Sequence, residues 1–213
     1  MRTYAWMKSG STWGDGSYKN AGTVMQAYAY AVSDSGRIAG KAMFGSGTFH
    51  AFRTIPSYGP VDANSDLGTL GGLASLSSET SALHDSSWIV GRSQNVNGYW
   101  RGFFSPVNCT GIVSGDELVR LNGVTVANYT SAAYGVNRYG HVVGYQTIDS
   151  GASRAFRFRS GLDGMIDLNT LLPPGNLWVL TKAVAINDGG VIVGYGTYNG
   201  QSTCWIMYPQ CQE

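Results

Sequence analysis

The sequence predicts an all-β protein, and within that class a β-propeller built from four-stranded repeats of about 50 residues. A short apolar stretch ends in a glycine once per repeat, at Gly40, Gly91, Gly144 and Gly194. These glycines are 51, 53 and 50 residues apart. A small residue followed by an aromatic one keeps the same period, and so does an acidic residue further along. Three signatures with one period indicate a true structural repeat.

The first two strands of each repeat are predicted to form a hairpin. The first strand alternates small and apolar residues, as in residues 183–186, and ends in a turn rich in Asn, Asp and Gly. The second is a continuous apolar run such as residues 191–193, which is typical of a strand covered on both faces. We expect the glycine at its end to allow a bulge or the close approach of another backbone.

The third and fourth strands carry the other two signatures. The small–aromatic pairs are Ala51-Phe52, Gly102-Phe103, Ala155-Phe156, Cys204-Trp205 and, near the N-terminus, Ala5-Trp6. We expect the aromatic to pack between neighbouring sheets, with room left by the small residue. The recurring acids of the fourth strand are Asp15, Asp66, Asp116 and Asp167. Their expected role is to accept hydrogen bonds from backbone amides in a turn; a ring of four that holds Ca²⁺ is the weaker alternative.

The whole chain, residues 1–213, is predicted to form a single repeat domain. Three full repeats are expected at 29–79, 80–131 and 132–181, with partial repeats at 2–28 and 182–207. Because the chain opens with third and fourth strands and closes with the first three, we expect a four-bladed ring closed by strands from both termini. Five third strands for four hairpins leave five partial blades as an alternative, or a spare edge strand that pairs with another molecule.

Several of these motifs resemble a known family. The stretches concerned are Asn187-Asp188-x-Gly-x-Ile-Val-Gly, His50-Ala51-Phe52-Arg53 and Asp66-Leu67-Gly68-Thr69-Leu70-Gly71-Gly72. They are similar to the HAF-repeat family of extracellular repeat proteins, named for a His-Ala-Phe triplet that is complete here only at residues 50–52. The resemblance covers essentially the whole chain and implies a bacterial, exported, β-rich repeat protein, outside the cell or on its surface. It implies no activity and no catalytic residues.

Composition excludes two classes of partner. The formal net charge is +1 and there is no basic tract, so a nucleic-acid partner is not expected. No apolar run approaches the roughly 18 residues of a membrane-spanning helix, so no membrane span is expected. The N-terminus shows no apolar segment of the signal-peptide kind, so in an exported protein Met1 would begin a mature domain.

Aromatic residues in loops or just after the second strands are the candidate ligand-binding residues. The set is Trp13, Tyr99, Trp100, Tyr145, Tyr195 and Tyr198. Flanked by Asn, Gln and Ser, such rings are suited to binding sugar rings, although packing between blades or cover of a sheet edge is the commoner role of an individual aromatic.

The search for catalytic and metal-binding motifs predicts neither a catalytic residue nor a metal or cofactor. GxSxG, HExxH, P-loop and GxGxxG motifs are missing from the sequence. The spacing of His50, His84 and His141 does not suit zinc, and exposed histidines are expected instead. Cys204 and Cys211 either form a disulfide that holds the C-terminal tail or remain free thiols.

Three hypotheses about function follow. The leading one is a secreted, non-enzymatic repeat protein that binds a glycan on a cell surface or another extracellular polymer. The second is a structural subunit that self-associates head to tail by strand exchange between chain ends. The third, an enzyme, is a carbohydrate-active hydrolase or lyase using carboxylates outside the periodic set, for which no recognisable arrangement is present.

Overall fold

The computed structural model describes the backbone of residues 4–9 and 12–17, and then residues 26–45, 47–55, 61, 63–84, 88–162 and 164–209. Apart from three short 3₁₀ helices, Ala63–Ser65, Ser114–Asp116 and Leu168–Leu171, the regular structure is all strand. The all-β prediction is therefore confirmed.

Within the described residues, four antiparallel sheets of three or four strands follow one another along the chain, each with its strands in sequence order. The first sheet contains β3 (Gln26–Val32), β4 (Ile38–Met43) and β5 (Phe49–Arg53). The second contains β6 (Ser78–His84), β7 (Trp88–Gln94) and β8 (Trp100–Pro106). The third contains β9 (Ser131–Val136), β10 (His141–Thr147), β11 (Ser153–Arg159) and β12 (Gly164–Asp167). The fourth contains β13 (Trp178–Ile186), β14 (Ile192–Tyr198) and β15 (Gln201–Met207).

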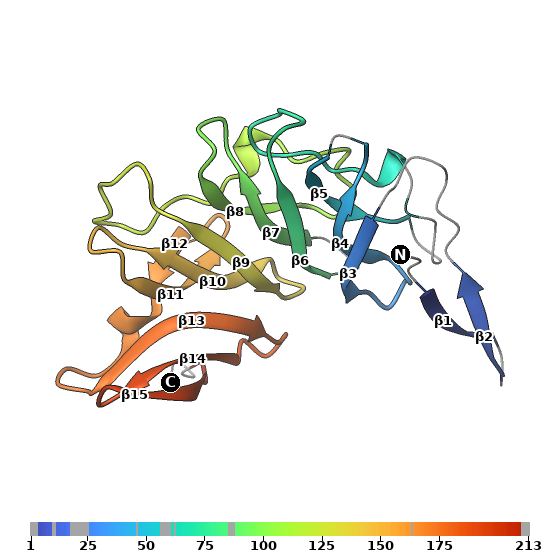
Figure 1. Ribbon diagram of the computed structural model, residues 1–213. Helices are drawn as coiled ribbons and strands as arrows, with labels where there is room; N and C mark the ends of the chain where they lie inside the picture. Colours follow the sequence, from blue (N-terminus) through green and yellow to red (C-terminus); the bar gives the residue numbers. More distant parts are fainter. Residues whose placement is uncertain are drawn as a thin grey trace.

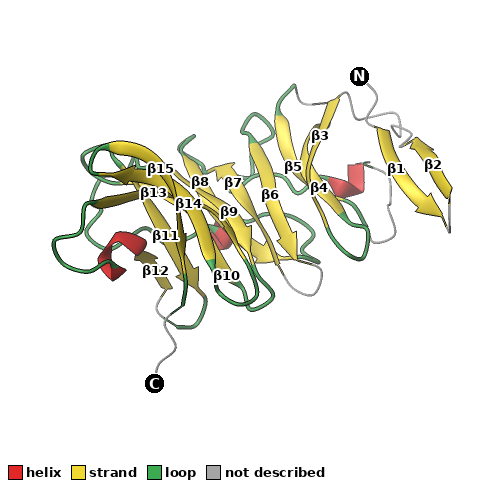
Figure 2. Ribbon diagram, turned by 90° about the horizontal axis from the view of Figure 1, so that it is seen from below, coloured by secondary structure: helices red, strands yellow, loops and turns green. Residues whose placement is uncertain are grey.

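The sheets stack in an arc, each with its first strand against the sheet before it (Figures 1 and 2). Thus β6 lies against β4 and β5, β9 against β7 and β8, and β13 against β10 and β11. The predicted repeat boundaries, at 79/80, 131/132 and 181/182, each fall inside such a first strand. Sheets of this kind bury their faces only by stacking, which explains why the motif repeats.

The repeated glycine occupies the same structural position in all four sheets. It lies opposite the aromatic of the third strand, as Gly91 does opposite Phe103. A Cβ on Gly91 would lie 2.1 Å from the carbonyl oxygen of Glu79 and 2.8 Å from the Phe103 ring. The first strand is bulged beside this point in every sheet, which brings its carbonyl close. The expected bulge and close backbone approach are both confirmed.

The aromatics of the third strands form the cores between sheets. Phe103 packs with Ala39 and Ala51 of the first sheet, and Phe156 packs in a cluster with Val90 of the second. Trp205 lies in the equivalent cluster with Val143 and Ala155 of the third. The prediction that the aromatic packs between neighbouring sheets is confirmed for these three residues, whereas Phe52 packs with residues of its own repeat such as Ala42.

Among the described residues of the four sheets, the fourth strand of the repeat is complete only in the third sheet, where Phe156 pairs with Asp167 on β12. In the first two sheets it is reduced to one isolated bridge, Phe52 with Asp66 and Phe103 with Glu117. The residue that corresponds to Asp66 and Asp167 in this pairing is therefore Glu117. Asp116 instead accepts a hydrogen bond from the backbone amide of Val113, the role expected for the periodic acids. Two adjacent acids made the sequence ambiguous, and only the backbone pairing shows which one lies opposite the aromatic.

The two ends of the chain carry the strand types that were predicted. β1 (Tyr4–Ser9) pairs with β2 (Thr12–Ser17), and Trp6 lies opposite Asp15 just as Phe156 lies opposite Asp167. Within the described residues, the fourth sheet contains β13, β14 and β15 and no strand from residues 4–17. Ring closure and blade count therefore stay predictions. Among the described residues, no helix is long and apolar enough to cross a membrane.

Candidate functional site

The structure separates the six predicted ligand-binding aromatics. Tyr99, Tyr195 and Tyr198 are exposed, whereas Trp100 and Tyr145 are half-buried. Trp13 lies in β2, and its side chain is outside the described residues. Two of the six, Tyr145 and Tyr195, come together around one lysine.

Lys182, on β13, lies among three tyrosine rings. Its Nζ is 4.6 Å from the centre of the Tyr145 ring, 5.1 Å from that of Tyr134 and 5.4 Å from that of Tyr195. The Tyr134 and Tyr145 rings are themselves stacked, with their centres 5.9 Å apart. Tyr134 and Tyr145 belong to the third sheet and Lys182 and Tyr195 to the fourth, so this cage bridges two sheets.

A second cage of the same design lies in the first sheet. The Nζ of Lys41, on β4, is 5.3 Å from the Phe49 ring centre, 5.6 Å from that of Tyr28 and 5.7 Å from that of Tyr30. The same nitrogen forms an ion pair with Glu79 of the second sheet at 3.2 Å. This cage too connects one sheet with the next.

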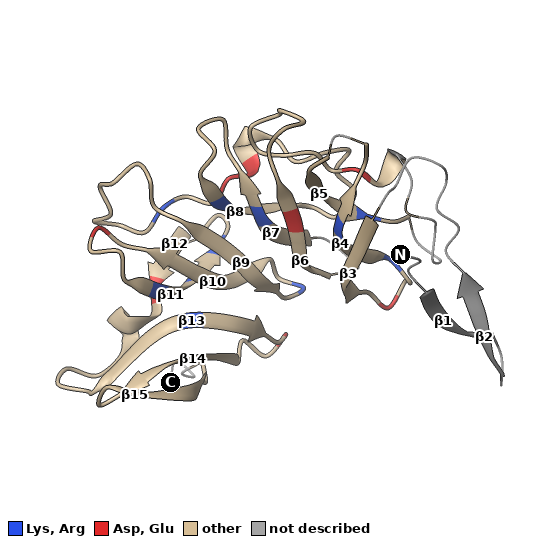
Figure 3. Cartoon of the chain, viewed as in Figure 1, with Lys and Arg blue, Asp and Glu red and all other residues tan. Residues whose placement is uncertain are grey.

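Glu79 links the first cage to an arginine–tryptophan pair. Its other carboxylate oxygen accepts a hydrogen bond of 2.7 Å from Nε of Arg92, whose guanidinium lies 4.6 Å from the Trp100 ring centre. Figure 3 shows these charges on neighbouring strands, blue on β4, red on β6 and blue on β7. We call the whole set the cation–aromatic row: Tyr28, Tyr30, Lys41, Phe49, Glu79, Arg92, Trp100, Tyr134, Tyr145, Lys182 and Tyr195.

The two lysines of the row are fully charged at neutral pH. Burial lowers the pKa of Lys41, but hydrogen bonds with Tyr30 and Glu79 outweigh this, so the pKa lies above its ordinary value. Burial likewise lowers the pKa of Lys182, and hydrogen bonds with Tyr195 and Tyr134 raise it above the ordinary value. With Arg92, the row holds three cations and one carboxylate, an excess of positive charge beside exposed aromatic rings.

The row has a simple origin in the repeat. The residue directly after the repeated glycine is Lys41, Arg92, Tyr145 or Tyr195 in the four sheets. The residue opposite it on the first strand is Tyr28, Glu79, Ala132 or Lys182. Tyr145 and Tyr195 were found in the sequence, but Lys182, which lies between their rings, was not, because its contacts join different repeats. The sequence did contain a signal for this site: in every repeat the residue directly after the glycine is either a cation or an aromatic.

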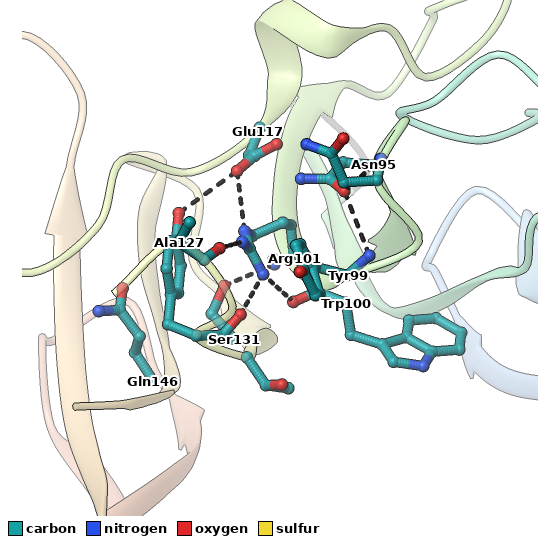
Figure 4. A network of polar contacts seen from close by, with 12 residues as sticks. Asn95, Tyr99, Trp100, Arg101, Glu117, Ala127, Ser131 and Gln146 are labelled. Carbon is teal, nitrogen blue, oxygen red and sulfur yellow. Dashed lines mark hydrogen bonds and ion pairs between the residues drawn. The ribbon is translucent and has the colours of Figure 1, made fainter. Parts of the chain in front are cut away.

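A second polar cluster surrounds Arg101 on β8 (Figure 4). The side chain is 2% exposed and donates to the carbonyl groups of Trp100, Ala127 and Tyr129. Its Nε forms an ion pair with Glu117 at 3.1 Å, and its guanidinium lies 3.7 Å from the Tyr129 ring centre. The carbonyl groups of Ala127 and Tyr129 belong to the loop before β9, so Arg101 fastens this loop to the second sheet.

The Arg101 pair is one case of an ion pair that recurs between the third and fourth strands. His50 pairs with Asp66 at 3.0 Å in the first sheet, and Arg154 with Asp167 at 3.9 Å in the third. The expectation that the histidines are exposed was therefore wrong for His50, which is buried because its ring is the basic member of this pair. The hydrogen bond with Asp66 raises the pKa of His50, although burial opposes the shift.

The remaining predicted sites have local explanations. Asp66 accepts from the backbone amide of Gly68, and Asp167 from that of Asn169, as expected for acids in turns. Within the described residues, no three His, Cys, Asp or Glu side chains lie close enough together to hold a metal ion. Cys204 is exposed on β15, whereas Cys211 lies outside the described residues, so a disulfide between them stays a prediction.

Comparison with known proteins identifies no relative. No family model matches the chain. No curated protein matches it, and no solved structure does.

Proposed function

We propose that the protein binds an extracellular polysaccharide along the cation–aromatic row, without catalysis. The observation that carries this proposal is the row itself, with two lysine cages and an arginine–tryptophan pair on successive sheets. Aromatic faces are suited to the C–H faces of sugar rings, and the excess of cations favours a polymer that carries carboxylate groups. Repetition along the stack suits a ligand that repeats as well.

The biological setting belongs to the same proposal. In it, the four sheets are blades of a propeller-like arrangement of the HAF-repeat kind, and the protein works outside the cell or on its surface. The motifs at residues 50–53, 66–72 and 187–194 support that part. No grouping of the described side chains favours hydrolase or lyase chemistry over binding.

Two tyrosines of β14 offer a matched test. Tyr195 and Tyr198 are both 47% exposed, but Tyr195 belongs to the row, whereas Tyr198 packs against Trp178 with ring centres 5.0 Å apart. We expect Tyr195→Ala to weaken binding to a carboxylated polysaccharide about fivefold, the loss that corresponds to about 1 kcal/mol of aromatic contact. Tyr198→Ala should leave binding unchanged. Affinity electrophoresis against neutral and carboxylated polysaccharides measures both.

The charge component has its own test. Lys182→Met keeps an apolar side chain within the cage but removes the cation, so binding to the carboxylated polymer should fall and become less sensitive to salt. Equal losses in Tyr195→Ala and Tyr198→Ala, or no binding of any polymer by the folded protein, would contradict the proposal.

A further inference from the structure

The outer face of the fourth sheet is open, although the same face is covered in the other three. The residue before the repeated glycine is 0% exposed as Ala39, Val90 and Val143, but 37% exposed as Val193. The small residue before the aromatic is buried as Ala51, Gly102 and Ala155, but exposed as Cys204. We call the exposed residues of this surface the tail face: Val184, Ala185, Val193, Tyr195, Cys204 and Ile206.

At the other end of the stack, β3 is the first strand of the first of the four sheets. It corresponds to β6, β9 and β13, which each lie against the sheet before them. The residue of each first strand that faces the preceding sheet is fully buried as Thr80, Ala133 and Ala183, but exposed as Ala29 on β3. We call the exposed residues of β3 the head strand: Gln26, Tyr28, Ala29, Tyr30 and Val32. Phe52, the aromatic of this sheet, is already buried, so β3 and not β5 is the part left to dock.

We propose that the tail face binds the head strand of a second copy of this chain, so that copies stack head to tail. The contact would repeat the interface that already joins β6, β9 and β13 to the sheets before them. Except for Gln26, the exposed residues of both halves are apolar or aromatic. The two halves lie at opposite ends of the stack of four sheets (Figures 1 and 2). A head-to-tail contact of this kind forms closed rings or open filaments.

The register of the repeat predicts one contact across the new interface. Within the chain, the residue after the repeated glycine meets the first strand of the next sheet, as Lys41 meets Glu79 and Tyr145 meets Lys182. The equivalent pair between copies is Tyr195 with Tyr28, which are both exposed aromatics. The cation–aromatic row would then continue from one molecule into the next. The stacking itself does not depend on any ligand.

Charged substitutions on each half give a test by mutual complementation. Val193→Asp damages only the tail face and Ala29→Asp only the head strand. We expect the mass of the unmodified protein, measured by sedimentation velocity without polysaccharide, to rise with concentration in multiples of 22.7 kDa. Each variant alone should remain a monomer. An equimolar mixture should form dimers and nothing larger, because each variant retains one intact half.

The mixture also controls for folding, since a misfolded variant could not pair. Val96→Asp, at an exposed position in the turn between β7 and β8, should associate like the unmodified protein. A monomer at every concentration would overturn the proposal, whether the tail face is free or covered by the chain's own N-terminal segment. Continued self-association of Ala29→Asp alone, with none for Val193→Asp, would indicate a tail-to-tail dimer and would also overturn it.

Discussion

The third and fourth sheets are built from the same motif but differ in what covers them. In both, the repeated glycine lies opposite the aromatic of the third strand, and a Cβ on Gly144 or Gly194 would meet a carbonyl oxygen at about the same distance, 2.0 or 2.1 Å. Yet Val143 is buried and Val193 is exposed. The repeat motif therefore determines the contact of the glycine within a sheet, whereas stacking against another sheet determines whether the valine before it is buried.

The largest expected loss of stability comes from replacing the repeated glycine, which both sheets require. Gly144→Ala would place a Cβ 2.0 Å from the carbonyl oxygen of Ala132, and that backbone cannot withdraw without breaking the pairing of β9 with β10. We expect a loss of about 3 kcal/mol or more in the free energy of unfolding. Gly115→Ala, which meets no atom within 4 Å, should change stability little. Urea unfolding measures both; similar losses would show that close approach is not the reason for the glycine.

The next effect compares two members of the recurring ion pair. Arg101 is almost fully buried, and Arg101→Met would leave Glu117 and three carbonyl groups without their partner. The expected loss is about 3 kcal/mol. Arg154 is 29% exposed and 3.9 Å from Asp167, so Arg154→Met should lower the free energy of unfolding by less than about 1 kcal/mol. Equal losses in urea unfolding would mean that burial does not distinguish the two pairs.

A smaller effect tests the comparison of the two sheets directly. Val143→Ala removes buried methyl groups and should lower the free energy of unfolding by roughly 2 kcal/mol, from lost burial together with a residual cavity. Val193→Ala, at the same repeat position, should lower it by less than about 1 kcal/mol because its side chain is partly in solvent. Measurement at low concentration, where no stacking occurs, keeps the comparison valid. A full-sized loss at Val193 would show that the tail face is covered within a single molecule.

The smallest effect is the pH dependence of the first sheet, where a histidine stands in place of the arginines. Because hydrogen bonding to Asp66 raises the pKa of His50 above its ordinary value of 6.5, the pair stabilises the fold fully below pH 6.5. That stabilisation is lost as the pH rises through the raised pKa. His50→Arg, which introduces the residue of the second and third repeats, should remove this loss. Unfolding free energies at a series of pH values compare the two proteins; identical slopes would contradict the assignment.

Much of the fold follows from residues that act within one sheet. Gly91 and Phe103 lie opposite each other on neighbouring strands, so their spacing already indicates a hairpin and its register. Spacing along the chain did not show which of two adjacent acids, Asp116 or Glu117, lies opposite the aromatic Phe103. The burial of His50 was missed for a related reason, because its partner is chosen by backbone pairing 16 residues away.

The candidate site was only half visible in the sequence. Tyr145 and Tyr195 stood out as aromatics after the second strands. Lys182 lies opposite Tyr195 in one hairpin, but nothing local relates Lys182 to Tyr145 in the preceding repeat. The cage forms because β13 lies against β9, β10 and β11 of the third sheet. Trp205 and Leu180 pack with Val143 in the core between the two sheets.

The period, the strand order and the glycine–aromatic register are properties of the amino-acid sequence, because each depends on sterics between neighbouring strands of one hairpin. The cation–aromatic row and the open tail face are products of tertiary structure. The row arises where one sheet lies against the next, and the tail face is open because no further described sheet covers it. The same motif is therefore buried at Val143 and exposed at Val193.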